Sequence, residues 1–158
     1  MHMHKFEKIW LSFGIGALIV FLIVVGVSAF HLGKKPPSSL ATINSEKVDQ
    51  TAPFTKSGLH KVEGKDWDYE LVVVASAFNY NPGSVKVPLG AKVKVIATTK
   101  DVVHGFEVAG TNINMMLEPG YISEYTTTFN KKGEYLVVCN EYCGTGHHLM
   151  TSKIEVVN

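Results

Sequence analysis

The hydrophobic positions divide the chain into one long apolar run and a later region of short runs. Ile9 to Phe30 is a stretch of 22 residues without a charged side chain, and a helix needs about 20 such residues to cross a bilayer. A buried core helix and a cleaved signal peptide are the alternatives, but the apolar part of a signal peptide usually has only about 7 to 15 residues. We therefore expect an uncleaved membrane-spanning helix over 9–31, after a short N-terminal segment, 1–8.

The segment from 32 to 66 shows no sustained hydrophobic period. It begins with the proline- and serine-rich stretch from Gly33 to Ser39, and residues of this kind end a helix and begin a tether. We predict that 32–66 is a linker.

From Trp67 onward the pattern changes to short runs rich in valine, aromatic and β-branched residues, which are typical of strands. The runs are 69–77, 84–87, 92–96, 121–129, 133–138 and 152–157, and proline- or glycine-containing turns separate them at 82–83, 88–90, 119–120 and 131–133. Several short strands at such intervals predict a sandwich or a barrel. We expect a mainly β domain over 67–158.

Charge excludes some classes of partner. Eight lysines and five acidic residues give 1–66 a formal charge of +3, and seven lysines and nine acidic residues give 67–158 a charge of −2. The chain has no arginine and no basic cluster, which argues against nucleic acid as a partner. With so little net charge, docking onto the domain depends on a local apolar or mixed patch more than on long-range attraction.

Candidate metal ligands gather near the C-terminus. The stretch from Cys139 to Met150 reads Cys-Asn-Glu-Tyr-Cys-Gly-Thr-Gly-His-His-Leu-Met and holds both cysteines of the chain. Thiolate and thioether are soft ligands that select copper over magnesium or calcium, and imidazole also suits copper. On a helix these ligands would form a ladder along one face instead of converging on one point, and two glycines disfavour a helix. We predict a loop held between strands 133–138 and 152–157.

A further nitrogen ligand is expected from upstream, and His104 is the best candidate. Each residue also has a simpler interpretation. The cysteines could form a disulfide, which an extracytoplasmic domain permits, or half of a zinc site, which would favour a Cys-x-x-Cys step and a second pair. His104 and Met150 could each be ordinary core residues. The joint spacing of all four residue types favours copper.

The motif Cys139-x-Glu141-x-Cys143-x-x-x-His147-x-x-Met150, with His104 upstream, resembles the binuclear copper A motif of cytochrome c oxidase subunit II. The stretches 77–82, Ala-Phe-Asn-Tyr-Asn-Pro, and 110–114, Gly-Thr-Asn-Ile-Asn, resemble the short, single-helix subunit II of the B-type haem-copper oxidases. The resemblance covers nearly the whole chain. It implies a cupredoxin-like Greek-key β-sandwich in which the metal loop joins the last two strands and His104 emerges at the same end.

The resemblance also implies a ligand set. Cys139 and Cys143 would each bridge two coppers, His104 and His147 would bind one copper apiece, Met150 would be a weak axial ligand, and the backbone carbonyl of Glu141 would complete the set.

Three neighbouring side chains lie outside this ligand set. His148 is read as a rim residue. Asp101 is a candidate to orient His104 or else a solvated turn carboxylate. In longer family members the side chain of the motif glutamate helps to bind magnesium, which leaves that role open for Glu141.

The function implied by the resemblance is electron transfer within an enzyme complex. Cytochrome c would donate electrons to copper A, and they would pass to haem in subunit I, which carries the haem and copper B and reduces oxygen. The missing second helix implies a small extra membrane subunit. Longer members receive electrons near a tryptophan-rich cluster, in whose place this chain offers Phe78 and Tyr80, with Trp67 further upstream.

The orientation in the membrane also follows from the resemblance. Lys5 and Lys8 precede the apolar run and Lys34 and Lys35 follow it, so the positive-inside rule gives a tie. The resemblance places the copper domain outside a single-pass cell-membrane anchor, with 1–8 in the cytoplasm.

Two other copper proteins are the alternatives. A membrane-anchored copper chaperone of the Sco type also has one helix and a Cys-x-x-x-Cys motif, but its thioredoxin-like domain follows the cysteines, and only 15 residues follow Cys143 here. A mononuclear blue-copper carrier needs one cysteine, two histidines and a weak axial ligand, which would leave Cys143 idle.

Overall fold

The computed structural model describes residues 3–31 and 38–158, which form a helical unit and a β domain. The helical unit consists of α1 (Lys5–Gly26), which continues as a π-helical turn, η1 (Val27–His31). Helix α1 begins where it does because the His4 side chain and Glu7 form a reciprocal capping box. Its apolar side chains are exposed along its length, and it is long and apolar enough to cross a membrane.

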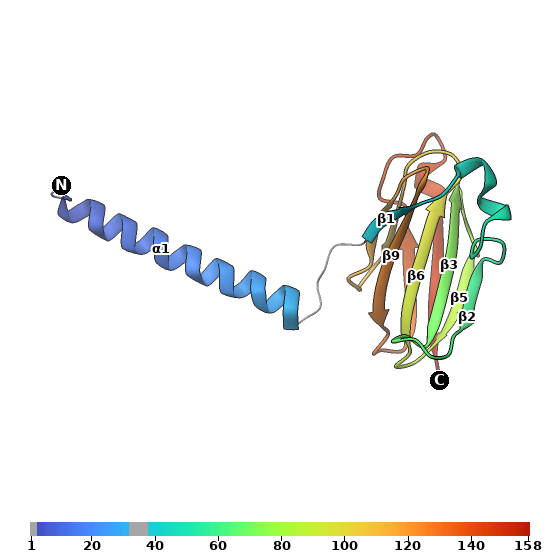
Figure 1. The fold of residues 1–158 in the computed structure, drawn as a ribbon, viewed down its shortest axis with the longest axis horizontal. Helices are drawn as coiled ribbons and strands as arrows, with labels where there is room; N and C mark the ends of the chain where they lie inside the picture. The colour runs from blue at the N-terminus through green and yellow to red at the C-terminus, as the bar shows by residue number, and fades with distance from the viewer. Residues whose placement is uncertain (1–2, 32–37) are drawn as a thin grey trace. The chain divides into compact units, whose positions relative to one another are not determined.

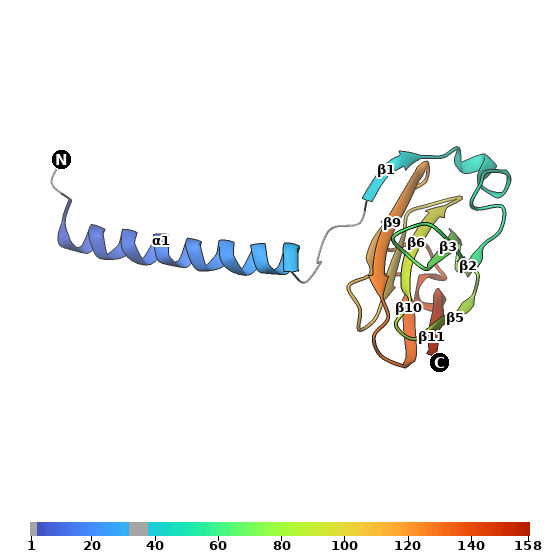
Figure 2. The ribbon, with the colours of Figure 1, turned by 60° about the horizontal axis from the view of Figure 1, so that its bottom comes forward.

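The β domain consists of two sheets packed face to face (Figures 1 and 2). The first has the strand order β1-β9-β6-β3-β2, with β4 also paired to β3, and the second has the order β5-β11-β10-β7-β8. The strands are β1 (Ser38–Thr42), β2 (Gly58–Lys61), β3 (Tyr69–Ser76), β4 (Asn79–Asn81), β5 (Ser84–Pro88), β6 (Lys92–Thr99), β7 (His104–Val108), β8 (Asn114–Leu117), β9 (Tyr121–Thr128), β10 (Gly133–Val138) and β11 (Thr151–Val157).

The expectation of a mainly β sandwich is confirmed. Strands β3, β5, β6, β9, β10 and β11 coincide with the six predicted runs to within a few residues at their ends. The sequence pattern did not single out β4, β7 and β8. These strands are only three to five residues long, which is too short for alternation to stand out.

The main core lies between the two sheets. Every second residue of β3 and β6 points into it, as Leu71, Val73, Val93 and Val95 show, and they meet inward residues of the second sheet such as Ile154. This alternation is the period-2 pattern of a half-buried strand. The metal-ligand candidates on the loop after β10 cap one end of this same core.

Residues 38–61 differ from the predicted linker. Strand β1 pairs with β9, and β2 pairs with β3, so both edges of the first sheet are extended. The short 3-10 helix η2 (Ser45–Gln50) and the turns after it bring Val48 and Phe54 onto the outer face of the sheet. There they bury Val72, Val74 and Ile96 in a second cluster. The remainder of the predicted linker includes 32–37, which lie outside the described residues.

The topology gathers three segments at one end of the sandwich. The loop from 139 to 150 joins the antiparallel neighbours β10 and β11, and β7 begins beside the end of β10, since Glu107 pairs with Val138. The turn between β3 and β4, at Ala77 and Phe78, reaches the same end. The C-terminus lies at the opposite end of the domain (Figure 1).

Candidate metal centre

The two thiols are the centre of the candidate site. Cys139 and Cys143 are both buried and unbonded to each other, with their Sγ atoms 3.7 Å apart. His104 places its Nδ1 3.9 Å from the sulfur of Cys139, and His147 places its Nδ1 3.6 Å from the sulfur of Cys143. Each sulfur therefore has one imidazole beside it.

Two weaker donors complete the cluster. The thioether sulfur of Met150 lies 3.8 Å from the Sγ of Cys143. The backbone carbonyl of Glu141 accepts a contact from the Sγ of Cys139 at 3.1 Å. The structure thus brings together all six groups predicted from the sequence.

The donor spacing suits metal ligation. Two sulfurs each about 2.3 Å from one tetrahedral metal are about 3.8 Å apart, and a sulfur and a nitrogen are about 3.5 Å apart. The distances of 3.6–3.9 Å among these sulfur and nitrogen atoms match these values. The residues present therefore fit a soft metal held by thiolates and imidazoles.

Burial affects the protonation of the thiols. Desolvation, followed by the hydrogen bond with Cys139, raises the pKa of Cys143 to about 11. Because a metal binds the thiolate form, loading this site must displace protons.

His104 is held from its far side by Asp101. The imidazole is fully buried, and its Nε2 lies 2.8 Å from the Oδ1 of Asp101, which leaves Nδ1 directed at Cys139. Ligating histidines commonly have such a carboxylate partner, which fixes the tautomer and the ring orientation. Of the two sequence interpretations of Asp101, the geometry favours the orienting residue.

The Asp101 carboxylate also ties two loops together. It accepts hydrogen bonds from the backbone N–H groups of Ala77, at 2.6 Å, and Val102, at 2.7 Å. Partial burial opposes ionisation, but the bonds from His104 and from these two N–H groups hold the pKa of Asp101 below its ordinary value.

Glycines let the loop pack closely against its neighbours. A Cβ on Gly146 would lie 2.5 Å from the ring of Phe78, and one on Gly144 would lie 3.1 Å from the same ring. The Phe78 ring therefore fills the space beside the turn between Cys143 and His147. Gly144 also has a positive φ of 130°, a conformation that side-chain-bearing residues rarely adopt.

Other residues flagged by the sequence lie in different positions. Tyr80 is buried and Trp67 precedes β3, at the end of the domain away from the cysteines. His148 is exposed beside the cluster.

Sequence reasoning missed Tyr142, which is 78% exposed and whose ring meets that of His147 edge-on, with 5.7 Å between the ring centroids. Its place inside the ligand motif was the signal that could have identified it.

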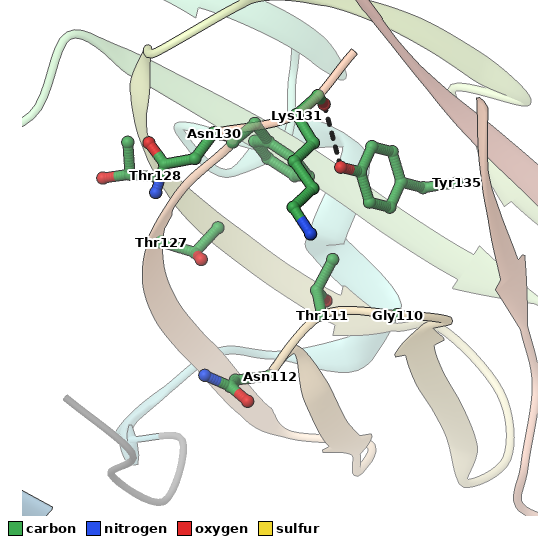
Figure 3. A pocket seen from close by; sticks show the side chains of 9 residues that line it. Gly110, Thr111, Asn112, Thr127, Thr128, Asn130, Lys131 and Tyr135 are labelled. Atoms are coloured by element: carbon green, nitrogen blue, oxygen red, sulfur yellow. Dashed lines mark hydrogen bonds between the residues drawn. The ribbon is translucent and has the colours of Figure 1, made fainter. Parts of the chain in front are cut away.

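A polar pocket at the other end of the sandwich is separate from this cluster. It lies between the β7–β8 turn and the β9–β10 loop, where Thr111, Asn112 and Lys131 face it (Figure 3). The Tyr135 hydroxyl donates to the Lys131 carbonyl there, at 2.9 Å. Its lining offers hydroxyls, amides and one ammonium, a set unlike the soft donors of the cysteine cluster.

Known proteins share this sequence and fold. The family model for the periplasmic domain of cytochrome c oxidase subunit II matches residues 78–157. Cytochrome c oxidase subunit 2 of Thermus thermophilus is 38% identical over 153 residues, covering 96% of this chain and 91% of the relative.

Solved structures agree. A chain of a haem-copper terminal oxidase dimer superimposes with a TM-score of 0.80 at 32% identity, covering 97% of this chain and all of that one. The periplasmic domain of subunit II from Bradyrhizobium japonicum shares the fold, with a TM-score of 0.54 at 20% identity, covering 59% of this chain and 86% of that one.

The fold is cupredoxin-like, as the sequence resemblance implied, and over residues 38–158 it differs from the thioredoxin-like fold of a Sco-type chaperone. Both the family and the fold imply copper, which suits the sulfur and imidazole donors at the end of β10. A subunit of this kind is part of a multi-subunit terminal oxidase with its domain on the outer side of the membrane. The chain therefore belongs to the cytochrome c oxidase subunit II family.

Proposed function

We propose that this chain holds a binuclear copper A centre with Cys139, Cys143, His104, His147, Met150 and the carbonyl of Glu141. The observation that carries the proposal is the pair of buried sulfurs, 3.7 Å apart, with one imidazole beside each. A mononuclear blue-copper site needs a single cysteine. Here each of the two cysteines has its own imidazole, at 3.9 Å for Cys139 and 3.6 Å for Cys143, which favours a role for both.

The outer donors divide evenly between the two sulfurs. Glu141 contributes its carbonyl on the Cys139 side, and Met150 contributes its thioether on the Cys143 side. When bound here, a copper pair supplies one-electron exchange. The chain contributes strand ends and a packed loop that keep the ligands in place when the charge changes, and the burial of both thiols and of His104 excludes water.

The partners we propose are cytochrome c as the electron donor and the haem of subunit I as the acceptor, with a small extra membrane subunit completing the complex. Tyr142 and Leu149, which are 78% and 71% exposed, form an apolar rim beside His147. A rim of this kind suits docking through a local patch rather than through a strong field.

The membrane placement is the next part of the proposal. We propose that 9–31, within α1 and η1, spans the cell membrane, that 1–8 lie in the cytoplasm, and that the copper domain is outside. The apolar surface of α1, which is exposed along its length, supports the span. The match of residues 78–157 to a periplasmic domain family supports the orientation.

The test is to load the full chain, purified in detergent, with copper. We expect two coppers per chain and an electron paramagnetic resonance spectrum in which one unpaired electron is shared equally by both. Cys143→Ser should abolish the shared signal because it removes one of the two sulfurs. A single copper per chain, or a signal localised on one metal, would refute the binuclear assignment.

Two neighbouring histidines provide a matched comparison. His147→Ala should disturb the spectrum, since its Nδ1 points to the Cys143 sulfur. His148→Ala, which removes the exposed neighbour, should leave it unchanged. The opposite pattern would mean that the ligand has been assigned to the wrong histidine.

A further inference from the structure

The backbone of Gly105, next to His104, is contacted at its N–H, its carbonyl and its Cα. Its N–H points at the Sγ of Cys139, with 3.4 Å between nitrogen and sulfur. Its carbonyl accepts a hydrogen bond from the Tyr80 hydroxyl. Its Cα faces the metal loop so closely that a Cβ would lie 1.8 Å from the Oδ1 of Asn140 and 2.6 Å from the backbone nitrogen of that residue.

Two of these contacts come from side chains that have partners of their own. Tyr80, on β4, is 1% exposed, and its ring packs edge-on against Phe106, with centroids 5.4 Å apart. The amide of Asn140 donates to the Oδ1 of Asn114, the first residue of β8, at 3.1 Å. Asn140 is thereby held over Gly105, so that residues of β4 and β8 both constrain the backbone that carries this N–H.

An N–H aimed at a cysteine sulfur affects the redox behaviour of a copper site. The hydrogen bonds around a ligating sulfur tune its reduction potential. The positive end of the N–H dipole favours the state in which the sulfur carries more negative charge, which is the reduced state. A loosened N–H should therefore lower the potential.

Building on the proposed function, we propose that Tyr80 and Asn114 are positioning residues that raise the reduction potential of the site. The Tyr80 hydroxyl holds the carbonyl of Gly105 by a hydrogen bond. Asn114 holds the Asn140 side chain, which in turn packs against the Cα of Gly105. Both keep the N–H of Gly105 directed at the sulfur of Cys139. Neither side chain is itself among the six ligating groups.

The experiment compares Tyr80→Phe and Asn114→Ala with the copper-loaded full chain in detergent. Three properties are measured: the reduction potential by spectroelectrochemical titration, the copper hyperfine splitting by electron paramagnetic resonance, and the melting temperature. We expect both variants to bind two coppers, with lower potentials and altered splitting. The Gly105 amide of each copper-free variant should also exchange with deuterium faster than in the wild type.

Tyr135→Phe is the matched control. It removes a hydroxyl that likewise donates to a backbone carbonyl, that of Lys131 (Figure 3). This bond lies at the opposite end of the domain, since Tyr135 is near the start of β10 and the metal loop follows its end. Its potential and splitting should equal those of the wild type. Because Tyr80 is buried, Tyr80→Phe could fail to fold, and Asn114→Ala, which alters an exposed residue, then decides the question.

The outcomes separate this inference from the function on which it rests. Lower melting temperatures with unchanged potential and splitting would show that Tyr80 and Asn114 only stabilise the fold, and would overturn the inference. A localised single-copper signal from the wild type would instead overturn the proposed function.

Discussion

At the scale of single residues, the candidate site depends on two glycines in the metal loop as well as on its donor atoms. Phe78 occupies the space that Cβ atoms at 144 and 146 would need. The ring is partly buried and packs against the main core. The glycines therefore let the turn between two predicted ligands lie flat on an aromatic surface.

Gly146→Ala should destabilise the domain because its new methyl group would overlap the Phe78 ring. Forcing an extra carbon into a packed site typically costs about 1–3 kcal/mol, and thermal unfolding should show the loss. Gly83→Ala is the control, since a Cβ there meets nothing closer than 3.9 Å. Adding Phe78→Ala should make the Gly146→Ala change nearly neutral, and two additive losses would contradict the overlap.

A second prediction at this scale concerns acid stability. Glu70 accepts hydrogen bonds from Lys65, at 2.6 Å, and from the indole of Trp67, at 3.2 Å. The bond from Lys65 is the main cause that lowers the pKa of Glu70 from its ordinary value of 4.5. A lowered folded-state pKa stabilises the fold above pH 4.5, and this contribution disappears as the pH falls through the folded-state value.

Glu70→Gln should therefore reduce the loss of stability as the pH falls below 4.5. Denaturant titrations across that range provide the measurement. Glu134→Gln is the comparison, because Glu134 pairs with Lys153 at a site that is 61% exposed, where water screens the pair. If Glu70→Gln and the wild type lose stability in parallel as the pH falls, Glu70 contributes nothing to the profile.

At the scale of elements, residues 38–61 are a structural part of the domain. Strands β1 and β2 extend both edges of the first sheet, and Val48 and Phe54 cover its outer face. Lys100, at the end of β6, forms an ion pair with Asp49 at 2.6 Å. These contacts protect a face that would otherwise expose Val72, Val74 and Ile96.

We predict that a fragment of residues 67–158 is much less stable than one of residues 38–158. Burying Val48 and Phe54 stabilises by about 1.5–3 kcal/mol each, so the shorter fragment should lose at least about 3 kcal/mol and tend to aggregate through its uncovered face. Denaturant unfolding and light scattering measure both effects. Equal midpoints for the two fragments would show that 38–61 is dispensable.

At the scale of the whole molecule, the proposed topology places the two termini on opposite sides of the membrane. Alkaline phosphatase fused after Asn158 should be active because it forms its disulfides only outside the cytoplasm. The same enzyme fused before Met1 should be inactive. Enzyme activity in intact cells is the measurement, and the reverse result would invert the proposed topology.

The lysines that flank the helix should bias this topology. Replacing Lys5 and Lys8 with glutamine should weaken the orientation, since these residues supply the cytoplasmic positive charge. Replacing Lys34 and Lys35 in the same way should preserve or strengthen it. An equal effect of both pairs would mean that folding of the domain, and not charge, decides the orientation.

Prediction from sequence succeeded where the information is local. The strands on either side of the metal loop were identified from alternation, and four of the six predicted ligating groups are side chains within this one loop. The sequence did not predict that residues 38–61 cover the outer face of the first sheet. The signal was present, since Leu71 to Ala75 is a continuous apolar run, which is typical of a strand buried on both faces. Residues 38–61 themselves show no hydrophobic periodicity, because their contacts with the sheet come from single side chains such as Val48 and Phe54.

The sequence by itself determined the long apolar helix, the β class of the domain and the soft character of its donors, because these depend on composition and on short periods along the chain. Only the tertiary structure decided how His104 reaches Cys139, how Gly105 fits against Asn140 and how Phe78 fills the space beside Gly146. Each of these contacts joins segments more than 30 residues apart. Their distances depend on strand register and on packing at one end of the sandwich, which no local pattern encodes.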